Sequence, residues 1–263
     1  MKNNFAEKIR ENGIVKIENF LSSDELKNFS NIIKFYQAPK GDKNSIFTMN
    51  FKILLIKLLK LDLRKLSDSY QLIKLQKDKQ LDIIAKEFFN KQAKLNQIDG
   101  YYSKVDNKDI LPWHTDQAYS GKKKPEEEFI HPDNFSLKFF IYLTNVSPNN
   151  GCMSYIAKSH KIGYEIRKAI FNREISYQPY WSIKDFIEIV KANKTFFIEK
   201  IGSGIIENFL EETKIENLMQ TTNKFDYSAK AGTMIIFDEG GVHRGSKPSL
   251  NDRMVIRYLF SSF

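Results

Sequence analysis

The sequence predicts an α+β protein, mainly β, in which a β-sandwich or β-barrel carries helices on its outside. Three observations predict this class. Between residues 50 and 95, apolar side chains recur every three or four positions, as they do in helices. After Asp99-Gly100 the pattern changes to short apolar runs between turn residues, which is typical of strands. Residues 163–220 are again amphipathic with little Gly or Pro, which predicts a helical insertion rather than a separate domain.

The elements follow one another in a definite order along the chain. Residues 14–20 predict a first strand, and Ser22 with Glu25 three positions later predicts the capped start of a helix over residues 26–36. We therefore expect the chain to open with a strand that is followed by a helix. The strands of the second half are expected at residues 101–105, 135–144, 152–156, 233–237 and 254–260.

The size and composition of the chain suit one large domain. Its 263 residues are 41% hydrophobic and 13% aromatic, which excludes a disordered tail. We expect residues 1–263 to form a single domain, helix-rich in 1–95 and with its β core in 96–263. The 41 Lys and Arg residues against 32 Asp and Glu give a net charge of +9, which attracts anions. Lysines are spread along the chain, so this charge indicates a lysine-rich composition more than a basic binding surface.

Cysteine usage and hydropathy indicate a cytoplasmic protein. Cys152 is the only cysteine, so no disulfide forms within the chain, and the sequence MKNNFAEKIREN at the start lacks the apolar core of a signal peptide. The most apolar run, residues 51–63, contains three lysines and is shorter than the ~20 apolar residues of a membrane span. Two interpretations of this run are open: a helix that covers the core, or a basic amphipathic helix on a membrane surface.

Two histidines and a carboxylate form a candidate metal site. His114 and Asp116 stand two positions apart, and on a strand such side chains point to the same side. A single His-x-Asp pair is more often only hydrogen-bonded. His243, however, follows the apolar strand expected at 233–237 and precedes the next strand. Two His and one carboxylate on neighbouring strands can occupy one face of an octahedral Fe(II) and leave three positions open.

The last predicted strand adds two arginines. Arg253 and Arg257 are four residues apart and therefore face the same side. An arginine that points into a barrel is costly unless it pairs with an anion. A dicarboxylate ligand would supply that partner, and either arginine is a candidate for binding it.

Four segments of the chain carry a more specific pattern. They are NGIVKIENFLSSDEL, WHTDQ, FFIYLTNVSPNNGCMSYIAKSHKIG and AGTMIIFDEGGVHRGSKPSLNDRMVIRYLF. In this order they resemble the opening strand and helix, the Trp-His-x-Asp metal motif, the Asn-Gly and Ser-His stretch, and the closing His, Gly-Ser and Arg segment of one family. This is the phytanoyl-CoA dioxygenase-like (PhyH) family of Fe(II)/2-oxoglutarate-dependent oxygenases, and the resemblance covers nearly the whole chain.

The resemblance implies a double-stranded β-helix (a jelly-roll, cupin-like fold) and a set of site residues. It implies Fe(II) as the metal, 2-oxoglutarate as the co-substrate, and His114, Asp116 and His243 as the metal ligands. It further implies that Arg253 holds the distal carboxylate of 2-oxoglutarate, with a hydroxyl donor from Ser246 and a contact from Tyr102.

The sequence departs from the family pattern at two positions. Arg244 lies between His243 and the Gly-Ser pair, and this extra residue leaves the choice between Arg253 and Arg257 open. Phe140 stands where members often have a Trp. In related halogenases the carboxylate ligand is replaced by Ala or Gly, so the presence of Asp116 favours hydroxylation.

The expected activity is hydroxylation of a small molecule or an acyl thioester, with release of succinate and CO2. A nucleic-acid demethylase of the same chemistry is a rival that only the net charge supports, and a non-enzymatic β-barrel that binds a metal or an anion is another. The polar loop 119–134, with Lys122, Lys123 and Lys124, is expected to be either a lid over the site or a solvated charged run. His131, His160 and Cys152 are not expected to take part in the chemistry.

Overall fold

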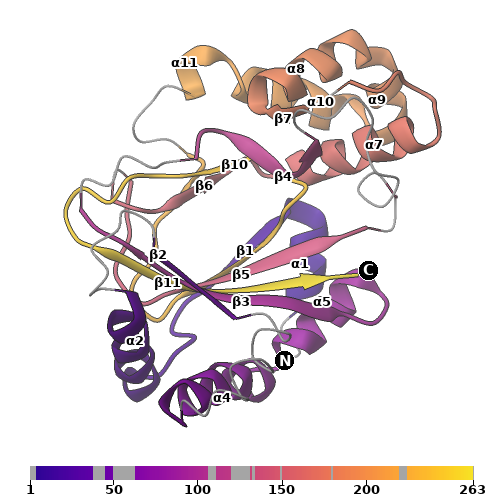
Figure 1. Ribbon diagram of the computed structural model, residues 1–263. Helices are drawn as coiled ribbons and strands as arrows, with labels where there is room; N and C mark the ends of the chain where they lie inside the picture. Colours follow the sequence, from indigo (N-terminus) through magenta and orange to yellow (C-terminus); the bar gives the residue numbers. More distant parts are fainter. Residues whose placement is uncertain are drawn as a thin grey trace.

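The computed structural model describes residues 4–37, 45–49, 63–105, 111–119, 131, 134–148, 150–178, 180–218 and 224–262. The predictions for the run 51–63 and for the loop 119–134 fall almost entirely outside the described residues. Two antiparallel sheets face one another at the centre of the fold, with helices above and below them (Figure 1). This is the predicted α+β architecture with a double-stranded β-helix core.

The larger sheet has six described strands in the order β1-β9-β5-β11-β3-β2. Their bounds are β1 (Ile14–Ile17), β9 (Met234–Asp238), β5 (Ser136–Tyr142), β11 (Arg253–Ser261), β3 (Lys94–Ser103) and β2 (Ser45–Met49). Neighbouring strands are antiparallel throughout. The predicted strands at 14–20, 135–144, 233–237 and 254–260 are thereby confirmed to within a few residues.

The smaller sheet has five described strands in the order β7-β4-β10-β6-β8. Their bounds are β7 (Tyr180–Ser182), β4 (His114–Tyr119), β10 (His243–Gly245), β6 (Met153–Tyr155) and β8 (Asp226–Tyr227). Apolar side chains of both sheets pack into one cluster between them, among them Tyr142, Met153 and Phe237. The space between the sheets is therefore packed with apolar side chains, some of which also line the site described below.

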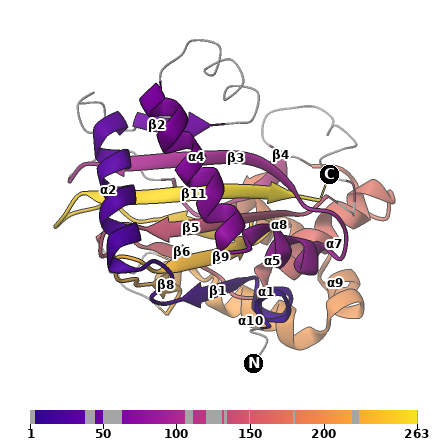
Figure 2. The ribbon, with the colours of Figure 1, turned by 90° about the horizontal axis from the view of Figure 1, so that it is seen from below.

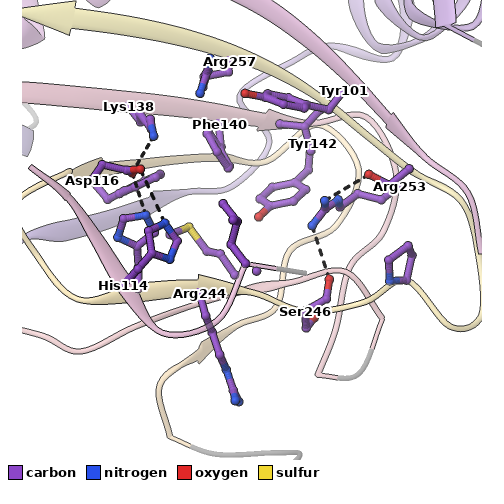
Figure 3. Close-up of a pocket in the computed structure, with 18 residues that line it drawn as sticks. Tyr101, His114, Asp116, Lys138, Phe140, Tyr142, Arg244, Ser246, Arg253 and Arg257 are labelled. Carbon is purple, nitrogen blue, oxygen red and sulfur yellow. Dashed lines mark hydrogen bonds and ion pairs between the residues drawn. The ribbon is translucent and has the colours of Figure 1, made fainter. Parts of the chain in front are cut away.

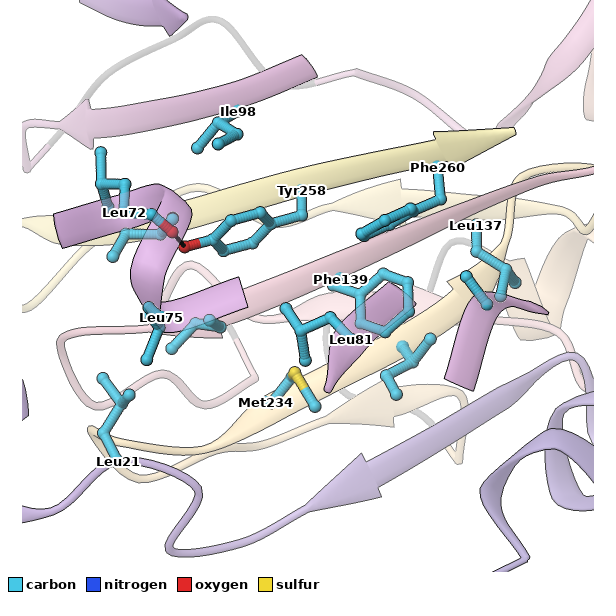
Figure 4. Close-up of a cluster of buried hydrophobic side chains, with 14 of the residues drawn as sticks. Leu21, Leu72, Leu75, Leu81, Ile98, Leu137, Phe139, Met234, Tyr258 and Phe260 are labelled. Atoms are coloured by element: carbon cyan, nitrogen blue, oxygen red, sulfur yellow. Dashed lines mark hydrogen bonds between the residues drawn. The ribbon is translucent and has the colours of Figure 1, made fainter. Parts of the chain in front are cut away.

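Four helices cover the outer face of the larger sheet (Figure 2). They are α1 (Phe5–Asn12), α2 (Ser23–Gln37), α4 (Leu63–Asp78) and α5 (Leu81–Phe89). Figure 4 shows Leu72 and Leu75 of α4 and Leu81 of α5 against the outward side chains of the sheet. The Tyr258 hydroxyl donates there to the Leu72 carbonyl at 2.7 Å. The helical character predicted for residues 50–95 is confirmed for α4 and α5 and ends where β3 begins at Lys94.

The start of the chain differs in part from the prediction. Glu25 and Ser22 exchange the two hydrogen bonds of a capping box, at 3.2 and 2.8 Å, which confirms the start of α2. The expectation that the chain opens with a strand is wrong, because α1 precedes β1. The Asn4 side chain caps α1, and Gly13, with a φ of +81°, ends it and is the single residue between this short helix and β1.

Two strands of the larger sheet also differ from the prediction. Asp99-Gly100 reads as a turn in the sequence but lies inside β3, which is ten residues long. Asp99 is tolerated there because it pairs with Arg257, its direct neighbour on β11. Strand β2, which pairs with β3 at the edge of the sheet, has no counterpart in the sequence prediction.

The expected insertion is a helical layer on the smaller sheet. It consists of α7 (Ser159–Phe171), α8 (Ile183–Ala192), α9 (Lys194–Ile201), α10 (Ser203–Glu212) and α11 (Ile215–Leu218), around an apolar cluster of its own. The insertion begins a few residues before the predicted 163–220 and contributes β7 to the sheet beside β4. Among the described helices none is both long enough and apolar enough to cross a bilayer.

Candidate active site

The pairing of two short strands brings the predicted metal ligands together. His243 on β10 is the direct partner of His114 on β4, and their ring centroids are 4.5 Å apart. Asp116 lies two residues further along β4, with its carboxylate oxygens 3.6 Å from His114 Nε2 and 2.9 Å from His243 Nε2. One donor atom from each of the three residues lies within 4.8 Å of the others. Donor atoms at such spacing can share one metal ion.

Hydrogen bonds to the backbone orient both imidazoles. His114 Nδ1 lies 2.7 Å from the Pro112 carbonyl oxygen, and His243 Nδ1 lies 2.9 Å from that of Gly241. A carbonyl oxygen only accepts, so each Nδ1 carries the proton and donates it. In the neutral tautomer that these bonds select, the lone pair is on Nε2, which faces Asp116, as metal coordination requires.

A buried lysine contacts the carboxylate of the triad. Lys138 on β5 places its Nζ 2.6 Å from Asp116 Oδ2 and 2.7 Å from Glu239 Oε1 (Figure 3). Burial alone would raise the pKa of Asp116, but the Lys138 ammonium and His243 lower that pKa well below its usual range. Burial likewise opposes the charge of Lys138, whose pKa the two carboxylates nevertheless raise. Asp116 and Lys138 therefore form an ion pair at neutral pH, whereas burial raises the pKa of Glu239 despite the neighbouring ammonium.

Sequence reasoning missed both Lys138 and Glu239. The available signal was a lysine in the middle of the apolar strand FSLKFFIYLT, at an alternate position that faces the interior. A second acid directly after TMIIFD gave the partner. A charged side chain that faces the protein interior from a strand needs a partner of opposite charge. This requirement could have connected Lys138 with Glu239.

Arg253 is the second buried cation of the site, at the start of β11. Its Nη1 donates to the carbonyls of Gly151 and Ser246 at 3.2 and 3.5 Å, and its Nη2 donates to Ser103 Oγ at 3.1 Å. Its Nε is buried without a hydrogen-bond partner. None of the ion pairs found in the described part of the chain includes Arg253, so only dipoles compensate its charge. Burial lowers its pKa accordingly.

The Asn150-Gly151 pair before β6 holds the Arg253 side chain in its position. Asn150 Oδ1 accepts from the backbone N–H groups of Ser249, Leu250 and Asn251 at 3.0 to 3.3 Å, which holds the turn that leads into β11. Gly151 has a φ of +78°, and a Cβ there would lie 3.0 Å from Arg253 Cδ. A larger residue would therefore strain the backbone and press on the arginine side chain.

Arg257 is engaged elsewhere. It forms an ion pair with Asp99, whose side chain is fully buried, and its guanidinium lies 5.1 Å from the centre of the Tyr101 ring. Arg257 also lines the cavity, but its charge already has a carboxylate partner. Of the two arginines left open by the sequence, Arg253 is therefore the one that lacks an anion.

The tyrosine and serine expected at the site lie in different places. Tyr102 does not line the cavity, because its hydroxyl donates to Asp252 Oδ2 at 2.6 Å on the other face of β3. The preceding Tyr101 faces the cavity instead, as alternation along a strand requires, and burial raises its pKa to about 12. Ser246 does line the cavity, and its N–H donates to the Cys152 carbonyl at 2.8 Å.

These groups share one cavity of about 530 Å³. The His114, Asp116 and His243 side chains lie at one end and Arg253 with Ser246 at the other (Figure 3). Apolar side chains form much of the wall between them: Leu111, Phe140, Met153, Phe237, Pro248 and Val255. A ligand that bridges a metal and an arginine fits this layout.

The two remaining histidines and the cysteine lie outside the cavity. His160 donates through Nε2 to the Arg10 carbonyl at 3.0 Å, and burial lowers its pKa. The ring of His131 packs on Phe171, with centroids 5.1 Å apart. Cys152 is buried, which raises the pKa of its thiol to about 11 and so disfavours the reactive thiolate.

Solved structures with the same fold bind metal and 2-oxoglutarate. The epimerase SnoN, in complex with Fe3+, α-ketoglutarate and nogalamycin RO, is 13% identical, with 98% of this chain and 82% of that chain covered and a TM-score of 0.55. The α-ketoglutarate-dependent carbocyclase SnoK is 14% identical, with 99% and 84% covered and a TM-score of 0.56. HygX from Streptomyces hygroscopicus, with nickel, 2-oxoglutarate and hygromycin B, is 13% identical, with 99% and 87% covered and a TM-score of 0.54.

Sequence comparisons give the family. No curated protein matched the sequence. The family model for phytanoyl-CoA dioxygenase (PhyH) matches residues 9–192, which is well over half of the chain and includes His114 and Asp116. His243 and Arg253 lie beyond the matched residues, and it is the fold that brings them to the same cavity. The chain belongs to the phytanoyl-CoA dioxygenase (PhyH) family of Fe(II)- and 2-oxoglutarate-dependent oxygenases.

Proposed function

We propose that this protein hydroxylates a small molecule with Fe(II) as the metal and 2-oxoglutarate as the co-substrate. One observation carries the proposal: a cavity has a His-Asp-His triad at one end and, at the other, a buried arginine without an acidic partner among the described residues. The triad offers nitrogen and oxygen donors suited to Fe(II), and Arg253 suits a carboxylate. The donor chemistry present therefore fits both groups.

The residues of the chain have distinct roles in this proposal. His114, Asp116 and His243 hold Fe(II), and the bonds from Nδ1 to backbone carbonyls keep each Nε2 lone pair available. Arg253 binds the distal carboxylate of 2-oxoglutarate, and Ser246 offers a hydroxyl beside it. Tyr101 takes the place that the sequence suggested for Tyr102, because only Tyr101 lines the cavity.

Bound Fe(II), 2-oxoglutarate and oxygen together supply an oxidant that inserts one oxygen atom into a C–H bond, with release of succinate and CO2. The chain orients the co-substrate between the triad and Arg253, and its apolar wall of Phe140, Met153 and Phe237 limits the water beside the metal. The presence of Asp116 supports hydroxylation over halogenation, since its carboxylate takes the ligand position that is left empty for a halide in related halogenases.

The size of the cavity supports a small-molecule substrate. A cavity of about 530 Å³ suits a metabolite beside the co-substrate better than a nucleic-acid duplex. HygX has been crystallised with hygromycin B, which is a small molecule in a related fold. SnoN and SnoK are an epimerase and a carbocyclase, so the test must also detect outcomes other than hydroxylation.

The test is an anaerobic titration of the apo-protein with Fe(II) and then 2-oxoglutarate, followed by aerobic reaction with a panel of metabolites. We expect succinate formation and a product that has gained one oxygen atom by mass spectrometry. A product of unchanged mass would indicate epimerisation, and a loss of two hydrogens would indicate ring closure; both would refute hydroxylation. Metal binding without succinate formation would support the non-enzymatic barrel, and salt-sensitive nucleic-acid binding with demethylation would support the nucleic-acid enzyme.

A further inference from the structure

Lys138 lies between two buried carboxylates at the edge of the candidate metal site. Its ammonium contacts Asp116 Oδ2 at 2.6 Å and Glu239 Oε1 at 2.7 Å. The side chains of Lys138 and Glu239 are only 10% and 9% exposed, whereas that of Asp116 is 26% exposed and faces the cavity. The two carboxylate oxygens are thus at most about 5.3 Å apart, the sum of the two contacts.

The backbone holds Glu239 in this place. Its carbonyl oxygen accepts from the Asp116 N–H at 3.1 Å and from Thr115 Oγ1 at 3.0 Å. Both donors belong to β4, the strand that carries His114 and Asp116. The backbone of Glu239 is therefore tied to the strand of the metal ligands, which keeps the base of its side chain beside the triad independently of Lys138.

This arrangement creates a coordination problem. Asp116 has a second oxygen, and Glu239 is a further hard oxygen donor within reach of the same region. An Fe(II) site that uses 2-oxoglutarate needs three open positions, since the co-substrate takes two and oxygen one. Each additional carboxylate oxygen that bound the metal would fill one of them.

We propose that Lys138 is a positioning residue that limits the protein to three donor atoms at the metal. Its ammonium engages Oδ2 of Asp116 together with the carboxylate of Glu239, which limits Asp116 to one donor atom and keeps Glu239 out of the coordination sphere. The positions that remain are those that 2-oxoglutarate binds. The inference rests on the proposed function, and it assigns to Lys138 and Glu239 a role that the triad itself does not reveal.

The test compares metal binding with co-substrate binding in Lys138→Met. Co(II) serves as the metal probe, because its visible spectrum reports coordination number, and 2-oxoglutarate is then added without oxygen. We expect Co(II) affinity equal to or higher than that of the wild type, since a competing positive charge is gone. We expect the Kd for 2-oxoglutarate to rise at least about 10-fold, the usual scale for loss of an outer partner of a metal ligand.

Three further variants separate positioning from stability. Lys138→Arg keeps the positive charge and can still donate to both carboxylates, so its affinity for 2-oxoglutarate should stay within a few-fold of the wild type. The double variant Lys138→Met/Glu239→Gln removes the competing carboxylate and should recover most of the lost affinity. Arg257→Met removes a buried cation from the same cavity without touching the triad, and should leave the Co(II) affinity and spectrum unchanged while lowering the unfolding temperature.

The outcomes separate a failure of the proposed function from a failure of the inference about Lys138. A wild-type protein that binds no Co(II), or no 2-oxoglutarate after Co(II), would overturn the proposed function. A wild type that binds both, with Lys138→Met binding 2-oxoglutarate equally well, would overturn only the inference. A double variant weaker than Lys138→Met would also overturn it, because a merely structural lysine predicts that result. Lys138→Gln, which keeps a donor, replaces Lys138→Met if the latter does not fold, with the same expectations.

Discussion

Replacement of Arg253 by lysine tests the assignment of the co-substrate carboxylate. Arg253 already donates to two carbonyls and to Ser103 Oγ, and its buried Nε has no partner. An ammonium offers one point charge in place of the planar fork, so one of two charge-assisted bonds to the carboxylate is lost. Such a bond contributes about 1.5–3 kcal/mol, which corresponds to a rise of roughly 10- to 150-fold in the KM for 2-oxoglutarate.

Arg257→Lys is the matched control, since both arginines face the cavity from β11. Arg257 pairs with Asp99, so its replacement weakens a buried ion pair and should lower the free energy of unfolding by about 1–3 kcal/mol. Its KM for 2-oxoglutarate should stay within about threefold of the wild type. The assay is succinate formation at varied 2-oxoglutarate, beside urea unfolding of each variant. A large rise in KM in Arg257→Lys alone would refute the assignment of Arg253.

Three further predictions follow from the same contacts. His114→Ala, Asp116→Ala and His243→Ala should each abolish Fe(II)-dependent succinate formation with a near-native circular dichroism spectrum, and full activity in any of them would remove that residue from the triad. Asn150→Ala should raise the KM for 2-oxoglutarate several-fold, because it frees three N–H groups of the turn before Arg253; an unchanged KM would contradict this role. Burial lowers the pKa of His160 below the 6.5 of a free histidine, so stability should fall as pH drops below that value, by up to about 1.4 kcal/mol per pH unit. Urea unfolding between pH 7 and 5 should show a smaller loss of stability in His160→Gln than in the wild type.

The sequence predicted those parts of the fold that depend on local patterns. Alternation and apolar runs located β5, β9 and β11, and the Ser22-Glu25 capping box located α2. The spacing of His114 and Asp116 placed two donors on one side of a strand, which the structure reproduces. Such features depend on neighbours within a few residues, so one segment contains all the information.

The features that the sequence did not reveal depend on contacts between distant segments. Asp99-Gly100 has the composition of a turn, and only the partner Arg257 on β11 makes an acid acceptable within β3. Tyr101 and Tyr102 differ by one position, and the register of β3 against β11 decides which of them faces the cavity. A shift of one residue in register exchanges the two faces of a strand, so adjacent tyrosines cannot be distinguished by composition.

The balance of buried charge links these distant contacts to the proposed chemistry. At the metal end, the two carboxyl groups of Asp116 and Glu239 share the single ammonium of Lys138. At the other end, Arg253 has one positive charge without an acidic partner among the described residues, whereas Arg257 is balanced by Asp99. Uncompensated buried charges are costly, so each end favours a ligand of opposite sign. Bound as proposed, a divalent metal with the dicarboxylate 2-oxoglutarate would neutralise both ends at once: the metal and the chelating carboxylate would balance the cluster, and the distal carboxylate would balance Arg253.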